Sequence, residues 1–409
     1  MNNTVSIVSA DNECIYEAVC RAFELAGGRQ ALGYNERVLI KPNVCVPAPS
    51  GSGMVTDARV LEAVTRLVLD LGAKPVIGEG ASAGYDFVGA SSTEEAFRVS
   101  GARAVADKLG VALRNLNADD SVELEVDGGF VMERVTVARS VVDCDRIISV
   151  PVLKSHHRTL ATLNLKNMKG VLSGAEKRKT HRLGLDLGIA DLFSVVRPDF
   201  CFVDALTGLQ GLWNYPEDSV SLGLILAGAN PLAVDTAGIR LMGLEPNQAM
   251  HLQYCCRKQG FDAESVDIVG DHPERTPQPF LSSSKAFLQR FPKVRLVQGQ
   301  RACSGCVGQL VGALAYIRDA CLEHTLKGLT LAAGAPFSEE VPGPRILYVG
   351  VCCKEQTGRN GFVPGCPPNE EQLLRHLGGI CGFDAEQVLA RRKTERNKLW
   401  EQTRDLLNT

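Results

Sequence analysis

The stretch RVLIKPNVCVPAPSGSGMVTDARVLEAVTRLVLDLGAKPVIGEGAS, residues 37–82, contains a strand, a helix and a second strand in succession. RVLIKPN (37–43) and KPVIGEGAS (74–82) are apolar and strand-like, whereas TDARVLEAVTRLVLDLGA (56–73) repeats its apolar residues at helical spacing. Thr56 is predicted to cap this helix. A strand–helix–strand unit of this kind is typical of a parallel sheet with helices packed on its faces.

The same alternation continues on both sides of this unit. Strands are predicted at 5–8, 146–154, 200–206 and 221–228, and a further helix at 13–28. The sequence therefore predicts an α/β fold with a doubly wound, mostly parallel sheet.

The length of the chain, 409 residues, predicts two domains, because a single hydrophobic core rarely grows so large. The stretch 271–294 is rich in Pro and Ser and interrupts the strand–helix pattern. We predict a substrate-binding α/β domain at 1–272, a linker at 273–296 and a smaller, cysteine-rich α/β domain at 297–409. The last domain is expected to contain a helix near 307–323, a strand at 345–351 and a charged helix near 385–407.

The composition excludes several classes of partner. A formal net charge of -3 gives no support to a nucleic-acid or membrane-surface partner. No apolar run reaches the roughly 18 residues that a membrane helix needs, and the N-terminus does not read as a signal peptide. We therefore expect a cytoplasmic protein whose 14 cysteines stay reduced. The composition leaves a homo-oligomer open.

Half of the cysteines lie in the last 110 or so residues, whereas those before residue 300 show no pattern. Cysteines that cluster in a reducing compartment more often bind metal or do redox chemistry than form disulfides. Cysteines three apart can point the same way, and a cysteine after a strand lies where α/β folds place functional groups. The candidates are Cys303 and Cys306 in RACSGCVG, Cys352 and Cys353 in YVGVCCKEQTG, and Cys366 in VPGCPP.

Four thiolates from these loops predict a 4Fe-4S cluster, which is held by four cysteines. A structural zinc ion in a tetrahedral site is the alternative, and unliganded or dithiol cysteines are a third interpretation. Zinc sites usually use two compact pairs of cysteines, and the spacing here differs from that pattern.

The same segments resemble the proximal-cluster motif of the nickel–iron hydrogenase small subunit and of the related subunit of respiratory complex I. The matching residues are CSGC (303–306), GVCCKEQTG (350–358) and PGCPP (364–368). The resemblance implies that Cys303, Cys306, Cys352 and Cys366 are the cluster ligands. Because a glycine of the second motif is displaced, Cys353 could replace Cys352.

Three segments of the first domain carry polar chemistry. The first is LIKPNV, in which Lys41 and Asn43 follow a strand and point into the region where α/β sheets bind ligands. The second is IGEGAS (77–82), with Glu79, a loop whose amides could hold an anion or form a plain tight turn.

The third segment, SVPVLKSHHRTLATLNLKNMKGVLSG (149–174), is rich in cations and imidazoles. This density predicts a site for a carboxylate or phosphate. Adjacent histidines on an extended segment point opposite ways, so at most one of them is expected to face the site and shuttle protons. The candidates are Lys154, His156, His157 and Lys166 for catalysis and Asn167 and Lys169 for binding, whereas Lys177, Arg178 and Lys179 are interpreted as a solvated loop.

Two acids complete the predicted site. Asp204 ends a strand in FVDALTG, and Asp235 lies near a helix start in NPLAVDTAG. Either could orient a lysine or bind a hydroxyl group, and Asp235 could equally complement the helix dipole.

Residues 5–245 resemble the domain of unknown function 362 family. The matching motifs are VLIKPNV, TDARVLEAV, GEGAS, SVPVLKSHHRTLATLNLKNMKG, VDALTGLQG and NPLAVDTAGIRLMG, in this order. Members often occur with iron–sulfur modules, and the resemblance implies no firmly assigned reaction.

The function predicted from these features is an iron–sulfur reductase. Its cluster would pass electrons from a ferredoxin or another reductant to an anionic small molecule at the Lys/His segment 154–169. The alternatives are a non-redox isomerase, lyase or ligase acting on a phosphorylated or carboxylated metabolite, and a maturation protein that carries a cluster or cofactor. The chain lacks a P-loop, a G-x-G-x-x-G fingerprint after its first strand and a G-x-S-x-G elbow. Flavin binding stays open.

Overall fold

The computed structural model describes residues 2–10, 14–82, 93–156, 158–212, 216–271, 279–302, 304–356 and 361–391. The chain divides into two compact units, Met1–Ala286 and Phe287–Thr409. The boundary lies within helix α12 (Ser283–Arg290), which occupies part of the stretch predicted as a linker, 273–296.

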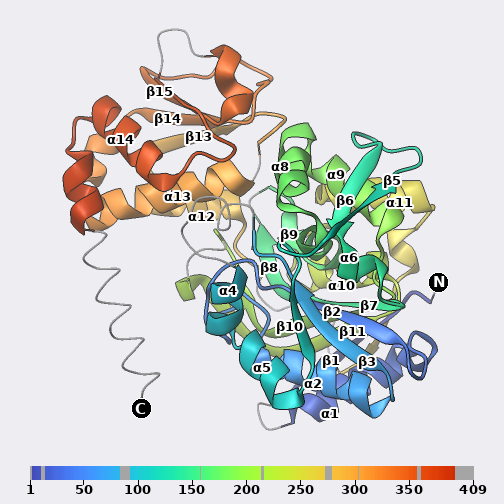
Figure 1. The fold of residues 1–409 in the computed structure, drawn as a ribbon. Helices are drawn as coiled ribbons and strands as arrows, with labels where there is room; N and C mark the ends of the chain where they lie inside the picture. Colours follow the sequence, from blue (N-terminus) through green and yellow to red (C-terminus); the bar gives the residue numbers. More distant parts are fainter. Residues whose placement is uncertain are drawn as a thin grey trace. The chain divides into compact units, whose positions relative to one another are not determined.

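The first unit is built on a ten-stranded sheet, which confirms the predicted α/β class (Figure 1). Most neighbouring strands are parallel, except that β11 runs antiparallel to β1 and β10, and β9 to β8. The main order is β12 (Asp267–Gly270), β1 (Thr4–Ser9), β11 (Ser219–Gly228), β10 (Phe200–Leu209), β7 (Arg146–Val150), β2 (Arg37–Pro42), β3 (Lys74–Glu79) and β4 (Ala112–Asn115), with β8 (Val152–His156) and β9 (Leu160–Thr162) off this path.

Helices cover both faces of this sheet because successive strand residues point to opposite sides. In β10, Phe200 and Phe202 belong to one buried cluster, whereas Cys201 and Val203 belong to another. The first cluster includes α1 (Ile15–Leu25), α2 (Ala58–Asp70), α4 (Thr93–Ser100) and α5 (Ala102–Leu109), and the second includes α9 (Leu185–Val195), α10 (Pro231–Leu241) and α11 (Met250–Gln259).

The start of α2 differs from the prediction. The N-cap is Asp57, whose side chain accepts a hydrogen bond from the Arg59 amide, so the expected cap at Thr56 is wrong. The Thr56 hydroxyl instead donates to the Val150 carbonyl at 2.7 Å and accepts from the Asn43 amide at 2.8 Å. Thr56 therefore ties the ends of β2 and β7 together.

The apolar stretch predicted as one strand, 146–154, forms two. Pro151 separates β7 from β8, and its carbonyl accepts the Asp204 amide at 2.8 Å. Strand β7 pairs with β2 and β10, whereas β8 pairs with β10 and β9. The strand pairing thus changes from β2 to β9 at the point where the Lys/His segment begins.

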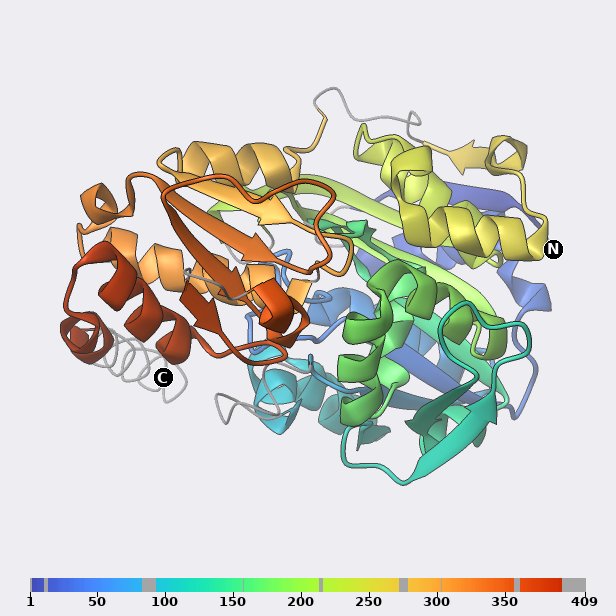
Figure 2. The ribbon, with the colours of Figure 1, turned by 90° about the horizontal axis from the view of Figure 1, so that it is seen from above.

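The second unit contains a four-stranded parallel sheet, seen as orange arrows in Figure 2. Its order is β13 (Val294–Gln298), β14 (Leu329–Ala333), β15 (Arg345–Val349) and β16 (Gly361–Val363). Helices α13 (Ser304–Asp319) and α14 (Glu370–Cys381) belong to this unit. Most of the charged helix predicted near 385–407 lies outside the described residues.

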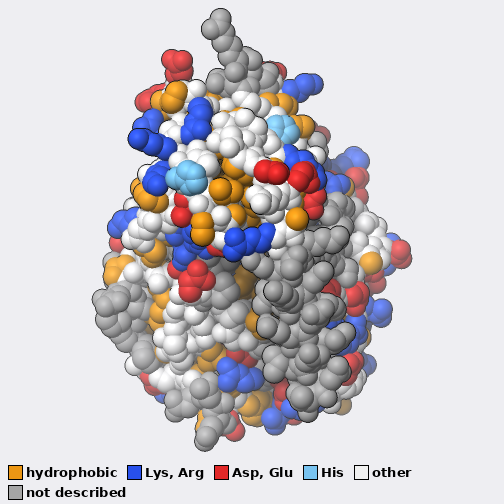
Figure 3. Space-filling model, turned by 90° about the vertical axis from the view of Figure 1, so that its left-hand side faces the viewer, with side chains coloured by type: hydrophobic (Ala, Val, Ile, Leu, Met, Phe, Trp, Pro, Cys, Tyr) orange, Lys and Arg blue, Asp and Glu red, His pale blue; other side chains and the backbone are white. Residues whose placement is uncertain are grey.

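Within the described ranges, no helix combines the length and apolarity needed to cross a bilayer. On the face shown in Figure 3, basic and acidic side chains are interspersed among the coloured residues.

Candidate functional site

The polar residues of the first unit gather where parallel strands end. In the register of the sheet, Lys41 of β2 lies opposite Ser149 of β7, and Glu79 is the last residue of β3. The carboxyl ends of parallel strands are where open α/β sheets bind ligands. The structure therefore brings the predicted motifs LIKPNV and IGEGAS to one edge of the sheet.

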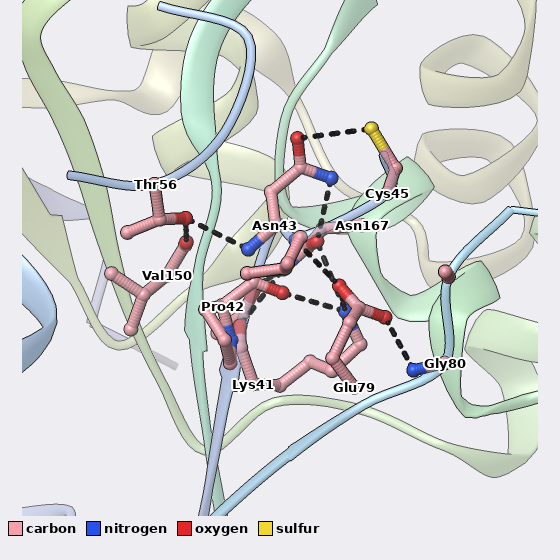
Figure 4. A network of polar contacts seen from close by, with 12 residues as sticks. Lys41, Pro42, Asn43, Cys45, Thr56, Glu79, Gly80, Val150 and Asn167 are labelled. Carbon is pink, nitrogen blue, oxygen red and sulfur yellow. Dashed lines mark hydrogen bonds and ion pairs between the residues drawn. The ribbon is translucent and has the colours of Figure 1, made fainter. Parts of the chain in front are cut away.

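Lys41 and Glu79 form a buried ion pair at this edge, with 2.7 Å between Nζ and Oε2 (Figure 4). The Lys41 ammonium also donates to the Pro42 carbonyl at 2.8 Å and to Asn167 Oδ1 at 3.2 Å. The Glu79 carboxylate accepts the Val44 amide as well. Burial lowers the pKa of Lys41 even though Glu79 opposes that shift. These contacts occupy the three donors of the ammonium, so Lys41 fixes the architecture of the site.

Asn43 and Asn167 link this ion pair to neighbouring segments. The Asn167 side-chain amide donates to the Lys41 carbonyl at 3.0 Å and to the Ser149 hydroxyl at 3.1 Å. The Asn43 amide group donates to Asn167 Oδ1 at 3.3 Å. Asn167 ends the short helix α7 (Asn164–Asn167), so these bonds hold α7 over the end of β2.

Lys154, on β8, lies beside a cysteine that the sequence patterns did not single out. Its ammonium donates to the Met54 carbonyl at 2.7 Å and lies 3.6 Å from the Cys45 sulfur. Cys45 is partly exposed, whereas Lys154 is buried, and Cys45 Sγ also lies 4.0 Å from Asn43 Oδ1. Cys45 follows the strand end in KPNVC, and that position is the signal that could have identified it.

Lys166, in the middle of α7, carries an amine that forms no hydrogen bond or ion pair with the described part of the chain. The side chain is partly exposed. Desolvation lowers the pKa of Lys166 to about 8, the charge of Lys154 adds to that shift, and Cys45 opposes it. An amine with such a pKa exchanges protons near neutral pH, which suits acid–base chemistry.

His156 is buried and its orientation is set by its own turn. Its Nδ1 accepts the backbone amides of Arg158 and Thr159, each at 3.2 Å. An acceptor at Nδ1 places the ring proton on Nε2. The prediction for His157 falls on a residue outside the described ranges.

Two further basic residues are buried rather than solvated. Lys169 lies 3.0 Å from His181 Nε2. Lys177, interpreted from the sequence as part of a solvated loop, instead donates to the carbonyls of Gly80 and Ala81 and to Asn117 Oδ1. Lys177 therefore anchors the loop after β3. Its position in the sequence, one helical turn after Ser173, does not indicate that its side chain is buried.

The two predicted acids support backbone segments. Asp204 accepts the amides of Asp57 at 2.7 Å and Leu206 at 3.0 Å, and burial raises its pKa to about 7. Asp235, on α10, accepts the amides of Asn164 and Leu165, and burial raises its pKa to about 6. Asp204 therefore holds the start of α2, and Asp235 holds α7, the short helix that carries Lys166.

Cysteine loops of the second unit converge near Gly350. A Cβ built on Gly350 would lie 2.8 Å from the Cys306 sulfur and 3.5 Å from the Cys352 sulfur. The Val351 amide donates to the Gly365 carbonyl at 3.0 Å, which brings the loop carrying Cys366 alongside. The absence of a side chain at Gly350 thus leaves room for the Cys306 and Cys352 sulfurs, which come from separate elements.

Cys353 differs from its neighbour. It is fully buried, and its sulfur lies 3.8 Å from the Ala332 carbonyl. A hydrogen bond from Cys352 and backbone amides lower its pKa to about 6.

Within the described residues, no group of three or more His, Cys, Asp or Glu side chains is arranged to hold a metal ion, and Cys303 lies outside them.

Two known proteins are similar to parts or all of this chain. The thylakoid-associated protein sll1697 of Synechocystis sp. is 26% identical over 223 residues, which span 52% of this chain and 64% of that protein. The lactate racemase apoprotein of Thermoanaerobacterium thermosaccharolyticum is 10% identical, with a TM-score of 0.38 over 93% of this chain and 90% of that one.

A family model gives the more specific result. It matches residues 38–240, which include all but the first residue of β2, the Lys/His segment, α7 and all but the last residue of α10. The resemblance inferred from the sequence motifs is confirmed over this region. Residues 38–240, which include every predicted polar site residue of the first unit, match the model of the family described as Domain of unknown function (DUF362).

Proposed function

We propose that the first unit binds an anionic small molecule at Lys154 and Lys166, and that the second unit holds a 4Fe-4S cluster, which makes the protein an iron–sulfur reductase. The observation that carries the anion site is the Lys166 amine, which is partly exposed, has no partner among the described residues and lies close enough to Lys154 for their charges to interact. Two lysines that form no ion pair with a carboxylate of the described residues favour a carboxylate or phosphate ligand.

The chain's own residues would divide the work. Lys154, held by the Met54 carbonyl, supplies a fixed cation, and Lys166 supplies a second cation or a proton. His156 accepts the backbone amides of Arg158 and Thr159 at Nδ1, which fixes the orientation of its ring beside Lys154 on β8. Asn167 and Asp235 hold α7 in place, so that Lys166 meets the ligand at a defined position.

The second unit offers cysteines of the type that a cluster needs. The Cys306 and Cys352 sulfurs around Gly350, with the loop of Cys366 alongside, are consistent with ligation, and Cys303 would complete the set. When bound, a cluster would supply single electrons at low reorganisation cost. A ferredoxin or another small reductant is the proposed electron donor.

The metal centre can be tested directly. Protein purified without oxygen should contain about four iron and four sulfide per chain. We expect Cys306→Ser and Cys352→Ser to lose most of this iron, and Cys321→Ser, on an exposed residue, to keep it. Electron paramagnetic resonance after dithionite reduction should show the cluster signal. Full iron in the first two variants, or one zinc in the wild type, would refute the iron–sulfur assignment.

A non-redox enzyme is the second candidate, and the pKa of Lys166 near 8 favours it. Such an amine could remove or return a proton in an isomerase or lyase reaction without any electron transfer. The two candidates differ in one measurement. A reductase should be reoxidised by its substrate after reduction, whereas an isomerase or lyase should exchange substrate hydrogen with deuterated solvent in the absence of any reductant.

A further inference from the structure

We propose that Cys45 is a nucleophile of the anion site and that it adds to the carbonyl carbon of a small molecule that also carries a carboxylate or phosphate. This inference rests on the anion site proposed above and is independent of the cysteines of the second unit. It gives a role to a thiol that the sequence patterns left unassigned.

The position of Cys45 is the first support. Cys45 comes three residues after Pro42, the last residue of β2, at the edge where parallel strands end. Its sulfur lies 3.6 Å from the Lys154 ammonium, and the side chain is partly exposed. The thiolate is the nucleophilic form of a cysteine, and this contact places the Lys154 ammonium beside the sulfur.

Lys166 belongs to the same electrostatic neighbourhood. The charge of Cys45 affects the pKa of Lys166, and the charge of Lys154 affects it in the opposite direction. The three groups therefore form one electrostatic cluster contributed by the loop after β2, by β8 and by α7. Cations placed on different elements around one sulfur are what stabilises a thiolate and an incoming anion at the same time.

An unused hydroxyl group gives independent support. Thr162 is only 2% exposed, and its Oγ1 has no hydrogen-bond partner among the described residues. In the antiparallel pair of β8 and β9, Thr162 lies directly opposite Lys154, so the two side chains share one face. A buried hydroxyl without a partner costs stability unless a ligand satisfies it. Thr162 is therefore placed to donate to an oxygen of the bound molecule.

The proposed step needs no oxidant or reductant. The Cys45 thiol passes its proton to the Lys166 amine, and the sulfur adds to the carbonyl carbon. A C–S bond forms as the C=O π bond breaks, and the new alkoxide oxygen takes the proton back from the Lys166 ammonium. Lys154 and Thr162 would hold the anionic and carbonyl oxygens. The product is a hemithioketal, in which every atom and electron pair of the reactants is retained.

The charge of the site can be tested by alkylation. Iodoacetate and iodoacetamide both transfer a carbon to sulfur and release iodide, but only iodoacetate is an anion. We expect Cys45 to prefer iodoacetate by about tenfold or more relative to the exposed Cys14 and Cys321 of the same sample. Lys166→Met and Lys154→Met should each reduce this preference. An equal preference at all three cysteines would refute the proposal.

The covalent step is tested by protection. Pyruvate and propionate carry the same carboxylate, but only pyruvate has a ketone. Pyruvate should slow the reaction of Cys45 with iodoacetamide more than propionate does, and carbon-13 NMR of [2-13C]pyruvate should show a new saturated-carbon signal that Cys45→Ser abolishes. Equal protection without the new signal would overturn the addition step. Because the readout involves no iron, a protein without a cluster would give the same result, so failure of the redox function is recognised separately.

Discussion

Asp235 holds Asn164 at two points: its Oδ1 accepts the Asn164 backbone amide at 2.8 Å and the Asn164 side-chain amide at 2.9 Å. Its other oxygen accepts the Leu165 amide at 3.0 Å. A carboxylate on α10 thus caps the start of α7, the short helix that carries Lys166. The position of the Lys166 amine depends on this contact between two elements that are far apart in the sequence.

Replacing Asp235 should therefore destabilise the protein and disturb the site. Asp235→Ala leaves the buried amides of Asn164 and Leu165 without an acceptor, and the free energy of unfolding should fall by about 3 kcal/mol. Denaturant titration monitored by circular dichroism measures this change. Asp235→Asn keeps one acceptor oxygen and should lose less. Equal stability of the alanine variant and the wild type would show that α7 is held by other contacts.

Asp204 should make stability depend on pH. Burial raises its pKa to about 7 in the folded protein, against roughly 4 in an unfolded chain. Between these values the folded state binds a proton that the unfolded state has released, so stability falls as pH rises from 4 to 7. In wild type, Asp204 should lower the free energy of unfolding by up to about 4 kcal/mol between pH 4 and pH 7, and Asp204→Asn should remove this pH dependence. The exposed Asp107→Asn serves as the control in denaturation experiments at a series of pH values.

Lys166 should be the unusually reactive lysine of the first unit. Competitive acetylation with acetic anhydride, followed by mass spectrometry, should give a midpoint near pH 8 for Lys166. Lys154→Met should move this midpoint upward because the charge of Lys154 lowers the pKa of Lys166. The exposed Lys74 provides the internal reference. A midpoint unaffected by Lys154→Met would contradict the proposed proximity of the two amines.

Gly170 should tolerate no side chain. A Cβ at this position would overlap Glu79 Oε1 and lie 2.6 Å from Lys41 Cε and 2.7 Å from its Nζ. Gly170→Ala should therefore disrupt the buried ion pair and cost about 3 kcal/mol, the lower end for breaking such a pair. At Gly379, on the exposed side of α14, an added Cβ would meet no atom of the described residues within 4 Å. Gly379→Ala should be neutral or slightly stabilising, and thermal unfolding of both variants makes the comparison.

The sequence predicted the sheet well because strand and helix periodicity are local properties. Lys41, Glu79 and Asn167 were all predicted to bind substrate, and the structure joins them in one network of hydrogen bonds. The structural role of Lys41 was not predictable from the sequence. Its ammonium donates to Glu79 and Asn167, which lie 38 and 126 positions further along the chain. Cys45 was not predicted as a site residue because a single cysteine forms no sequence motif. Its place in the site is visible only from its contact with Lys154, which is distant in the sequence.

The predictions for Thr56 and Lys177 were wrong because each side chain bonds to an acceptor that is distant in the sequence. Thr56 and Asp57 are both good capping residues, and the choice between them depends on the Val150 carbonyl, which engages Thr56 from another strand. The burial of Lys177 depends on the carbonyls of Gly80 and Ala81, which come from a distant loop. Neither acceptor can be identified from the residues beside Thr56 or Lys177.

The Asn167 side chain bonds to the Lys41 carbonyl, the Lys41 ammonium and Ser149 at once. Lifting α7 away from the sheet would leave the buried charge of Lys41 short of one partner. Local opening of this helix is therefore coupled to global unfolding, and its amide protons should exchange with solvent as slowly as those of the central strands. The site therefore forms only when the whole unit folds, and a partly folded chain would lack it.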